Sequence, residues 1–236
     1  MSNLDWMDGL GQEPEYDPLP EIAHRPEEEW LRQRLGMITG STFGKFVKTD
    51  RKGGYALSTG KVAADLIYKL AWERMLKVGS ISDGLGRMSF SSAATTHGND
   101  FEPMAVMKYQ EVTGNEVDYE QSFVKHSDWI GGTPDGYVDD DGIIEVKCPW
   151  NGGNHLQSIL TGEVYNPDYM YQIQGYLWIT KRKWCDFITY DPDLIDELQI
   201  NIIRIPRNED IINGISDVME EVKNRIKDIM AQIENR

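Results

Sequence analysis

Cysteine is scarce in this chain, whose 236 residues include only Cys148 and Cys185, together with four histidines. Two thiols cannot build a disulfide framework, and by themselves they cannot complete a four-cysteine zinc site or ligate an iron–sulfur cluster. His126 and His155 have no partner at a spacing typical of zinc ligands. We therefore expect a protein of the reducing cytoplasm, in which Cys148 is a buried small residue rather than a nucleophile.

Long apolar runs are absent as well, because no uninterrupted stretch is long enough to cross a bilayer. Residues 1–21, MSNLDWMDGLGQEPEYDPLPE, are acidic and lack the basic start and apolar stretch of a secretory signal. The sequence therefore predicts a cytoplasmic protein with no membrane partner.

Positive charge is in short supply overall, since the formal net charge is −15, but it is unevenly distributed. Residues 1–29 contain nine acids and one arginine, whereas residues 30–110 contain twelve Lys or Arg against six acids. A basic middle segment can contact phosphates whatever the total charge is. The acidic composition therefore does not exclude nucleic acid as a partner.

Residues 1–25 are rich in proline, glycine and acidic side chains and show little periodicity, which predicts a flexible acidic arm. Its role stays open between a solvated tail and a segment that docks onto a partner or a neighbouring subunit. Residues 26–236 are numerous enough to bury one large core, and we expect them to form a single domain.

The apolar periodicity of that domain changes repeatedly between the helical and the strand pattern, which predicts an α/β fold with a central mixed sheet flanked by helices. Ser41 is the expected N-cap of the second helix. Helices are expected from residue 26 and over 42–47, 58–78, 100–113, 168–180 and 211–233. Short strands are expected over 121–125, 129–132, 136–138, 143–148, 185–191 and 198–205. The segments 49–60 and 79–96 are expected to be loops.

The stretch GGTPDGYVDDDGIIEVKCP, residues 131–149, carries the most informative chemistry. Glu145 and Lys147 are two apart on an expected strand, so their side chains leave the same face. A short turn joins this strand to the preceding one, which allows Asp135 to lie beside Glu145. Two carboxylates and an ammonium group therefore converge at one edge of the sheet.

Such a group suits phosphodiester hydrolysis, which requires an activated water and stabilisation of a charged leaving oxygen. Mg²⁺ supplies both, and it prefers hard oxygen ligands such as the carboxylates of Asp135 and Glu145 and the carbonyl of Val146. Lys147 would orient the water and balance charge in the transition state. The simpler alternative is a surface salt bridge between Glu145 and Lys147.

The same residues match a known motif. The pattern of the PD-(D/E)XK nuclease superfamily is present as Pro134–Asp135, followed after nine residues by Glu145-Val146-Lys147. Over residues 28–230 the chain resembles the phage lambda exonuclease, or YqaJ-like viral recombinase, family. The matching motifs are TPDG at 133–136, EVKCP at 145–149, RLGMITGS at 34–41, Gly98–Glu102, the pair Gln172 and Gln174, and Trp178–Thr180.

This resemblance implies a restriction-endonuclease-like core and assigns roles to individual residues. The implied catalytic residues are Asp135, Glu145, Lys147, Glu102 and Gln172. The implied ligands of two Mg²⁺ ions, with Mn²⁺ as a substitute, are Asp135, Glu145, Val146 and Glu102. The implied pocket for a 5′-terminal phosphate is formed by Arg34, Thr39 and Ser41. Arginine offers a planar fork to phosphate, and hydroxyls near a helix start are suited to anions.

The implied activity is a 5′-to-3′ exonuclease that digests one strand of linear duplex DNA with 5′-phosphate ends. It leaves 3′ overhangs for a single-strand annealing protein. The family also implies a homotrimeric ring, in a phage or prophage of a bacterial host. The loop 79–96, with Arg87, Met88 and Phe90, lies where the family places a strand-separating wedge. Two alternatives stay open, an endonuclease or repair nuclease of the same superfamily and a non-catalytic DNA-binding recombination scaffold.

Overall fold

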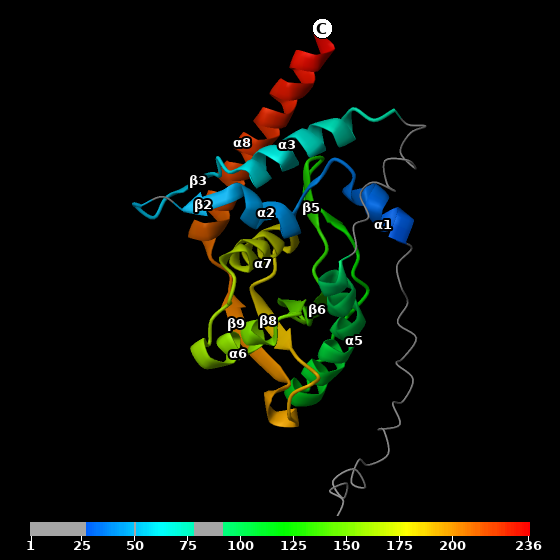
Figure 1. Cartoon of the computed structure of the whole chain (residues 1–236), viewed down its shortest axis with the longest axis vertical. Helices are drawn as coiled ribbons and strands as arrows, with labels where there is room; N and C mark the ends of the chain where they lie inside the picture. The colour runs from blue at the N-terminus through cyan, green and yellow to red at the C-terminus, as the bar shows by residue number, and fades with distance from the viewer. Residues whose placement is uncertain (1–26, 50, 78–91) are drawn as a thin grey trace, which may run out of the picture.

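The computed structural model describes residues 27–49, 51–77 and 92–236, with the side chains from residue 29 onward (Figure 1). The acidic arm predicted over 1–25 lies outside the described residues, as do Arg87, Met88 and Phe90 of the expected loop 79–96. Within the described parts of the chain, no helix is sufficiently long and apolar to span a membrane.

A four-stranded mixed sheet is the largest sheet, with the strand order β6-β7-β8-β9. Its strands are β6 (Gly136–Val138), β7 (Gly142–Lys147), β8 (Trp184–Tyr190) and β9 (Ile200–Pro206). β7 pairs in parallel with β8, and the other two pairings are antiparallel. Parallel neighbours need a long crossover, which α6 (Gly152–Thr161) and α7 (Pro167–Thr180) provide.

The remaining strands form two smaller sheets, so the strands do not all join one sheet as predicted. β1 (Ile38–Thr39), β5 (Ile130–Gly132) and β4 (Val124–Lys125) form a three-stranded sheet. β2 (Val47–Thr49) and β3 (Tyr55–Leu57) form an antiparallel hairpin. β3 lies in the segment 49–60 that was expected to be a loop, and β2 begins at Val47, the last residue of the helix expected over 42–47. Each strand has only three residues and therefore gives little periodic signal.

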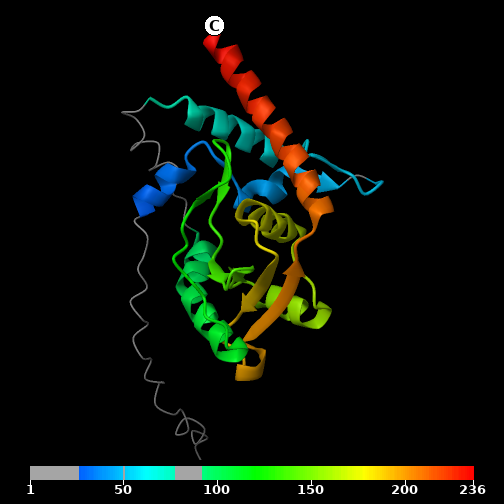
Figure 2. The same ribbon diagram turned by 180° about the vertical axis from the view of Figure 1, so that it is seen from behind.

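Helices cover the four-stranded sheet on both faces, as Figures 1 and 2 show. α5 lies against one face, and α7 with α2 and α8 lies on the other side. The mixed α/β architecture predicted from the sequence is confirmed. The other helices are α1 (Glu27–Arg34), α2 (Gly40–Phe46), α3 (Lys61–Arg74), α5 (Ala93–Thr113), the short 3-10 turn η2 (Asp196–Leu198) and α8 (Glu209–Glu234).

Several helix boundaries differ from the predictions. Thr39 rather than Ser41 is the N-cap of α2, so Ser41 lies in its first turn. α5 begins at Ala93, well before residue 100, because the Ser92 hydroxyl accepts a hydrogen bond from the Thr95 N–H at 3.1 Å. The helix α6 was not predicted, although Asn151 caps it through the Gly153 N–H.

β7 separates the two apolar clusters of the core. Ile143 packs with α7 and α8, whereas Ile144 and Val146 pack with α5 on the opposite face. Glu145 and Lys147 therefore project with Ile143 toward α7, which confirms that the two side chains share a face.

Candidate active site

Asp135, Glu145 and Lys147 meet at the end of β7. Asp135 lies just before β6, and its Oδ2 accepts a hydrogen bond from the Val146 N–H at 2.7 Å. The Lys147 ammonium bonds to Glu145 Oε1 and also donates to the Val146 carbonyl at 3.1 Å. The structure thus brings together the two carboxylates and the ammonium group that the hairpin pattern predicted to converge, with the Val146 carbonyl beside them.

Glu145 is a fully buried carboxylate, and only one of its two oxygens has a hydrogen-bond partner. The Gln172 side-chain amide of α7 donates to its Oε1 at 2.6 Å, while Oε2 has no hydrogen-bond partner. Burial, with the negative charge of Asp135 as the next cause, raises the pKa of Glu145 to about 8. An unsatisfied buried oxygen costs free energy, so the arrangement favours a cation at this position.

Glu102 approaches from α5 on the other side. Its Oε1 accepts hydrogen bonds from the Tyr119 hydroxyl at 2.8 Å and from the Gln121 amide. Burial, followed by the negative charge of Asp135, raises the pKa of Glu102 to about 7. Because Asp135 acts on both glutamates, all three carboxylates belong to one electrostatic group.

Sequence reasoning missed Tyr119 and Gln121 as site residues, since neither belongs to a motif. Gln121 has φ 52°, a left-handed backbone that is uncommon for a side-chain-bearing residue. The local hint in the sequence is that Gln121 begins the strand expected over 121–125 and Tyr119 lies two residues before it.

Lys147 remains an ammonium ion. Burial alone would lower the pKa of Lys147, but the negative charges of Glu145 and Asp135 hold it well above its ordinary value. The Tyr169 ring of α7 lies 5.1 Å from the ammonium nitrogen. As an ammonium ion, Lys147 can stabilise negative charge and orient an oxygen.

The donor groups fit a hard divalent cation. They comprise three carboxylates and one carbonyl, all oxygen, with a single ammonium to balance them. Within residues 27–49, 51–77 and 92–236, no three His, Cys, Asp or Glu side chains converge closely enough to enclose an ion. Water and the Val146 carbonyl would have to complete the coordination, which suits Mg²⁺ because it usually keeps several waters.

Arg34, Thr39 and Ser41 form a second cluster. The Arg34 guanidinium donates to the hydroxyls of Thr39 at 3.3 Å and Ser41 at 3.1 Å, and these hydroxyls lie 3.3 Å apart. The structure therefore brings these three predicted residues together at the start of α2.

Trp30 connects the two clusters. The Arg34 guanidinium stacks 4.2 Å from the centre of the Trp30 ring. The indole N–H of Trp30 donates to the Thr133 hydroxyl at 3.1 Å, and Thr133 lies two residues before Asp135. The Arg34 cluster and the carboxylates are thus neighbours in space.

The turn that carries Arg34 is anchored by Glu73, which sequence reasoning also missed. The Gly36 N–H donates to Glu73 Oε2 at 2.9 Å, and Glu73 is buried in α3. Gly36 has φ +66°, and a Cβ atom there would lie 2.7 Å from Arg74 Cγ. The turn therefore requires glycine, and its shape depends on a helix distant in sequence.

Two other predictions about individual residues can be compared with the structure. Cys148 is buried, and burial raises the pKa of its thiol to about 12, which leaves it unreactive. His155 is buried and bonded through its ring nitrogens to the Thr189 hydroxyl and the Leu198 carbonyl, so its role is structural.

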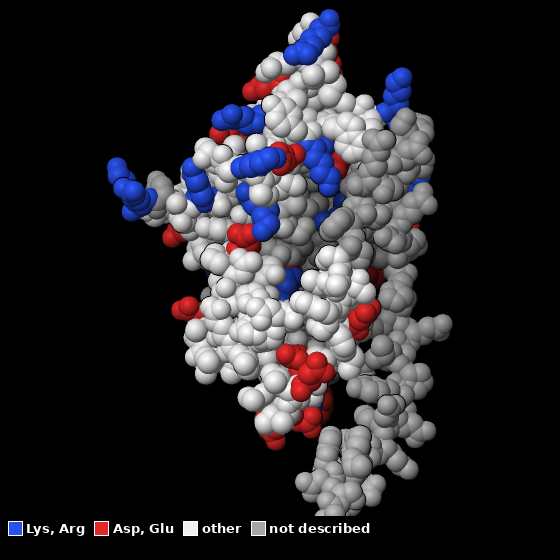
Figure 3. All heavy atoms as spheres, in the orientation of Figure 1, with Lys and Arg blue, Asp and Glu red and all other residues white. Residues whose placement is uncertain are grey.

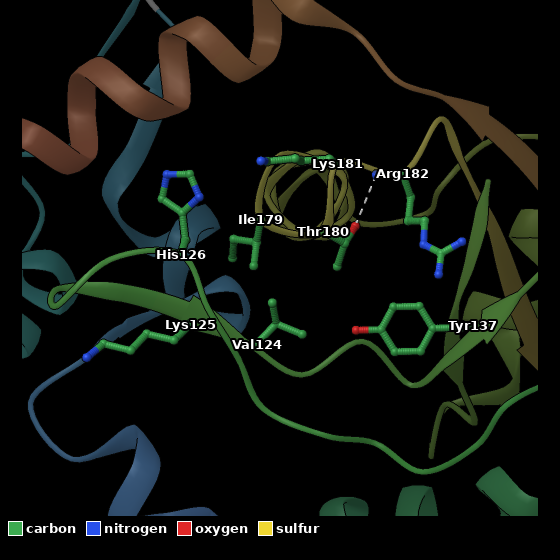
Figure 4. A pocket seen from close by; sticks show the side chains of 8 residues that line it. All are labelled: Val124, Lys125, His126, Tyr137, Ile179, Thr180, Lys181 and Arg182. Atoms are coloured by element: carbon green, nitrogen blue, oxygen red, sulfur yellow. Dashed lines mark hydrogen bonds between the residues drawn. The ribbon is translucent and has the colours of Figure 1, made fainter. Parts of the chain in front are cut away.

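A separate hollow of about 410 Å³ lies beyond the C-terminal end of α7 (Figure 4). Three cations, Lys125, Lys181 and Arg182, line it together with the Tyr137 ring and other side chains. None of the predicted site residues belongs to this lining. The hollow offers positive charge for a phosphate but no carboxylate for catalysis.

The chain is similar to solved exonuclease structures. Over 88% of its length the chain is similar to LHK-Exo in complex with dAMP, at 28% identity and a TM-score of 0.74, covering 96% of that chain. It is similar over the same share to an alkaline exonuclease, LHK-Exo, from Laribacter hongkongensis, at 29% identity and a TM-score of 0.69, covering 98% of that chain.

A third solved structure shares the fold. It is a phage-related exonuclease from Haemophilus somnus, 15% identical over 86% of this chain and 99% of that chain, with a TM-score of 0.63. No curated protein matches the chain.

The family model described as "YqaJ-like viral recombinase domain" matches residues 29–183, a range that holds both clusters and all of the predicted site residues. The chain is a member of this family, whose solved relatives are phage-type and alkaline exonucleases.

Proposed function

We propose that the protein is a Mg²⁺-dependent 5′-to-3′ exonuclease that digests one strand of linear duplex DNA. The observation that carries this proposal is the direct connection between the Arg34 cluster and the carboxylate cluster through Trp30 and Thr133. A phosphate-binding group beside a hydrolytic group is what an end-recognising nuclease requires.

The metal would be held by Asp135, Glu145 and the Val146 carbonyl, with Glu102 as a further ligand for one of two ions, and Mn²⁺ could substitute. When bound, Mg²⁺ lowers the pKa of a water molecule and stabilises negative charge on phosphate oxygens. Lys147 would orient the attacking water and stabilise the charge that develops at phosphorus. Gln172 holds Glu145 in place and presents its amide to the same space.

The polarity follows from the end that is bound. Arg34, Thr39 and Ser41 would bind the 5′-terminal phosphate, so that the next phosphodiester lies at the carboxylates. Repeated cleavage would shorten that strand from its 5′ end and leave a 3′ overhang. Such an overhang is the substrate of a single-strand annealing protein, which we propose as the partner in recombination.

Surface charge is compatible with DNA binding. In Figure 3 the Lys and Arg side chains gather over the end of the molecule that carries α2, α3 and the β2–β3 hairpin, and acidic side chains gather at the opposite end.

We also propose a homotrimeric ring, because a closed ring retains DNA even when the phosphate affinity of each subunit is modest. Sedimentation as a monomer at micromolar concentration would count against the ring.

The test is digestion of end-labelled linear duplex with a 5′-phosphate or a 5′-hydroxyl, with and without Mg²⁺. The proposal predicts Mg²⁺-dependent release of nucleotides from the 5′ end, faster with a 5′-phosphate. Cleavage of covalently closed circles would favour an endonuclease instead. Binding without metal and without any cleavage would favour a recombination scaffold.

A further inference from the structure

An exposed tryptophan stands next to the candidate active site. Trp150 follows the end of β7 by three residues and keeps 67% of its surface exposed. A three-residue span reaches at most about 10 Å between Cα atoms, so the backbone of Trp150 lies close to that of Lys147. Single exposed apolar side chains are common, and position alone does not give this one a role.

The surroundings of Trp150 hold it in place. Its ring meets the His97 ring edge to face, at 5.4 Å between centres and an interplanar angle of 90°. His97 in turn packs 4.7 Å from Phe101, which contacts the apolar cluster under α5. The exposed indole is thus the end of an aromatic chain that begins in the core.

The backbone on each side of Trp150 is fixed as well. Cys148 is buried, and the Asn151 side chain caps α6 through the Gly153 N–H at 3.1 Å. The ring is therefore ordered before any ligand arrives, which reduces the entropy cost of binding. An ordered, largely exposed aromatic face is the surface on which nucleobases stack, whatever their sequence.

α5 ties this surface to the catalytic group. The helix carries His97 and Phe101 directly before Glu102, and β7 carries Lys147 directly before the segment with Trp150. The same two elements therefore position both the carboxylates and the aromatic pair. We propose that Trp150, supported by His97, stacks on the nucleobase adjacent to the scissile phosphate and positions that nucleotide for cleavage.

This inference rests on the proposed nuclease function, and the experiment separates the two. Linear duplexes carry a single abasic nucleotide at each of the first three positions of the digested strand, and the parent duplex has all its bases. Cleavage is measured for the full-length wild type, Trp150→Ala, Trp150→Phe and Leu160→Ala. Leu160 is the matched control, because it is 85% exposed on α6 and belongs to neither cluster.

Trp150→Ala is expected to lower kcat/KM on intact duplex by about 5- to 150-fold, the range for loss of one stacked base. Trp150→Phe should keep most of the activity, and Leu160→Ala should match the wild type. On the duplex that lacks the stacked base, kcat/KM of the wild type should itself be low, and Trp150→Ala should lower it little further. An equal loss on every duplex, or no loss at all, would overturn the proposal.

Two further measurements keep the outcomes distinct. Equilibrium binding of the same duplexes with Ca²⁺ in place of Mg²⁺ should show the same base-dependent loss for Trp150→Ala. If the wild type binds in this way yet cuts nothing, the nuclease function fails while the stacking surface stands. If Trp150→Ala instead changes the sedimentation coefficient, the indole contacts another copy of the chain, and the stacking proposal is wrong.

Discussion

Two buried carboxylates on neighbouring strands have opposite surroundings. Asp186 on β8 receives two hydrogen bonds at 2.8 Å from the Arg204 guanidinium and one at 2.7 Å from the Tyr109 hydroxyl. Glu145 on β7 keeps one oxygen without any hydrogen-bond partner. The two side chains lie on opposite faces of the sheet, with Asp186 against α5 and Glu145 against α7.

The contrast is between a carboxylate that the fold satisfies and one that we propose as a metal ligand. The charge of Asp186 is balanced within the chain, so the group contributes to the fold and has no capacity left for a ligand. Glu145 lies among further carboxylates, and Lys147, which bonds to its Oε1, balances only part of their combined charge, so a bound cation would compensate the rest. Burial alone would not have separated the two, since both are almost inaccessible.

The largest expected effect comes from removing the charges of the candidate site. Glu145→Gln and Lys147→Ala should each lower the rate of DNA cleavage by more than about a hundredfold. The unfolding temperature of Glu145→Gln should equal or exceed that of the wild type, because the change removes a buried, incompletely compensated charge. Steady-state cleavage and thermal unfolding measure the two quantities. Unchanged cleavage would remove Lys147 and Glu145 from the active site.

Asp186→Asn should show the reverse pattern. Breaking a buried ion pair costs about 3–5 kcal/mol, and because Arg204 is largely exposed we expect about 2 kcal/mol here. Cleavage per folded molecule should be retained. The matched control is Asp141→Asn, which breaks the exposed pair with Lys183 and should cost at most about 1 kcal/mol. Equal urea-unfolding free energies for the two variants would contradict the structural role of Asp186.

The third prediction concerns stability and pH. The pKa values of Glu145 and Glu102 are about 8 and about 7 in the metal-free fold, above their ordinary value of 4.5. Between pH 4.5 and about 8 the folded chain therefore binds more protons than the unfolded chain does. The contribution of the two glutamates to the free energy of unfolding falls as the pH rises through this range. Adding Mg²⁺ should raise the unfolding temperature far more at pH 8.5, where the glutamates are ionised, than at pH 6.

The control for this effect is Glu145→Gln, which should weaken both the pH dependence and the response to Mg²⁺. Asp186→Asn, by contrast, should keep the Mg²⁺ response of the wild type. If Mg²⁺ stabilised the wild type and Glu145→Gln equally, the ion would bind elsewhere.

The smallest expected effect comes from the basic hollow beyond α7, whose lining includes none of the three carboxylates of the candidate site. Lys181→Ala should weaken DNA binding modestly and lower the slope of log affinity against log salt by up to about one. The measurement is a binding titration at several salt concentrations with Ca²⁺ present. An unchanged slope would show that DNA does not pass over this hollow.

The local part of the site could be predicted from the sequence. Two-residue alternation placed Glu145 and Lys147 on one face, and the short turn before β7 placed Asp135 beside them. The helix over residues 168–180 placed Gln172 on a defined face, and the structure confirms a helix there. Each inference depended on residues close together in the chain.

What could not be predicted depends on contacts between distant segments. Glu73 anchors the Gly36 turn, and Tyr119 holds Glu102, yet none of these pairs has a local signature. The β2–β3 hairpin was missed because three-residue strands in a polar, glycine-containing sequence give weak periodicity. The helix α6 was missed although its apolar residues Leu156, Ile159 and Leu160 recur at helical spacing. The unmet hydrogen-bonding capacity of Glu145 follows only from three-dimensional packing.

We propose above all that the carboxylates and the Arg34 cluster form one end-recognising site. The most direct measurement is the ratio of kcat/KM for 5′-phosphorylated and 5′-hydroxyl duplexes, in wild type and Arg34→Ala. We expect a ratio well above one for the wild type and close to one for Arg34→Ala, with cleavage of the 5′-hydroxyl duplex little changed. An equal loss on both duplexes, or a preserved ratio, would contradict it.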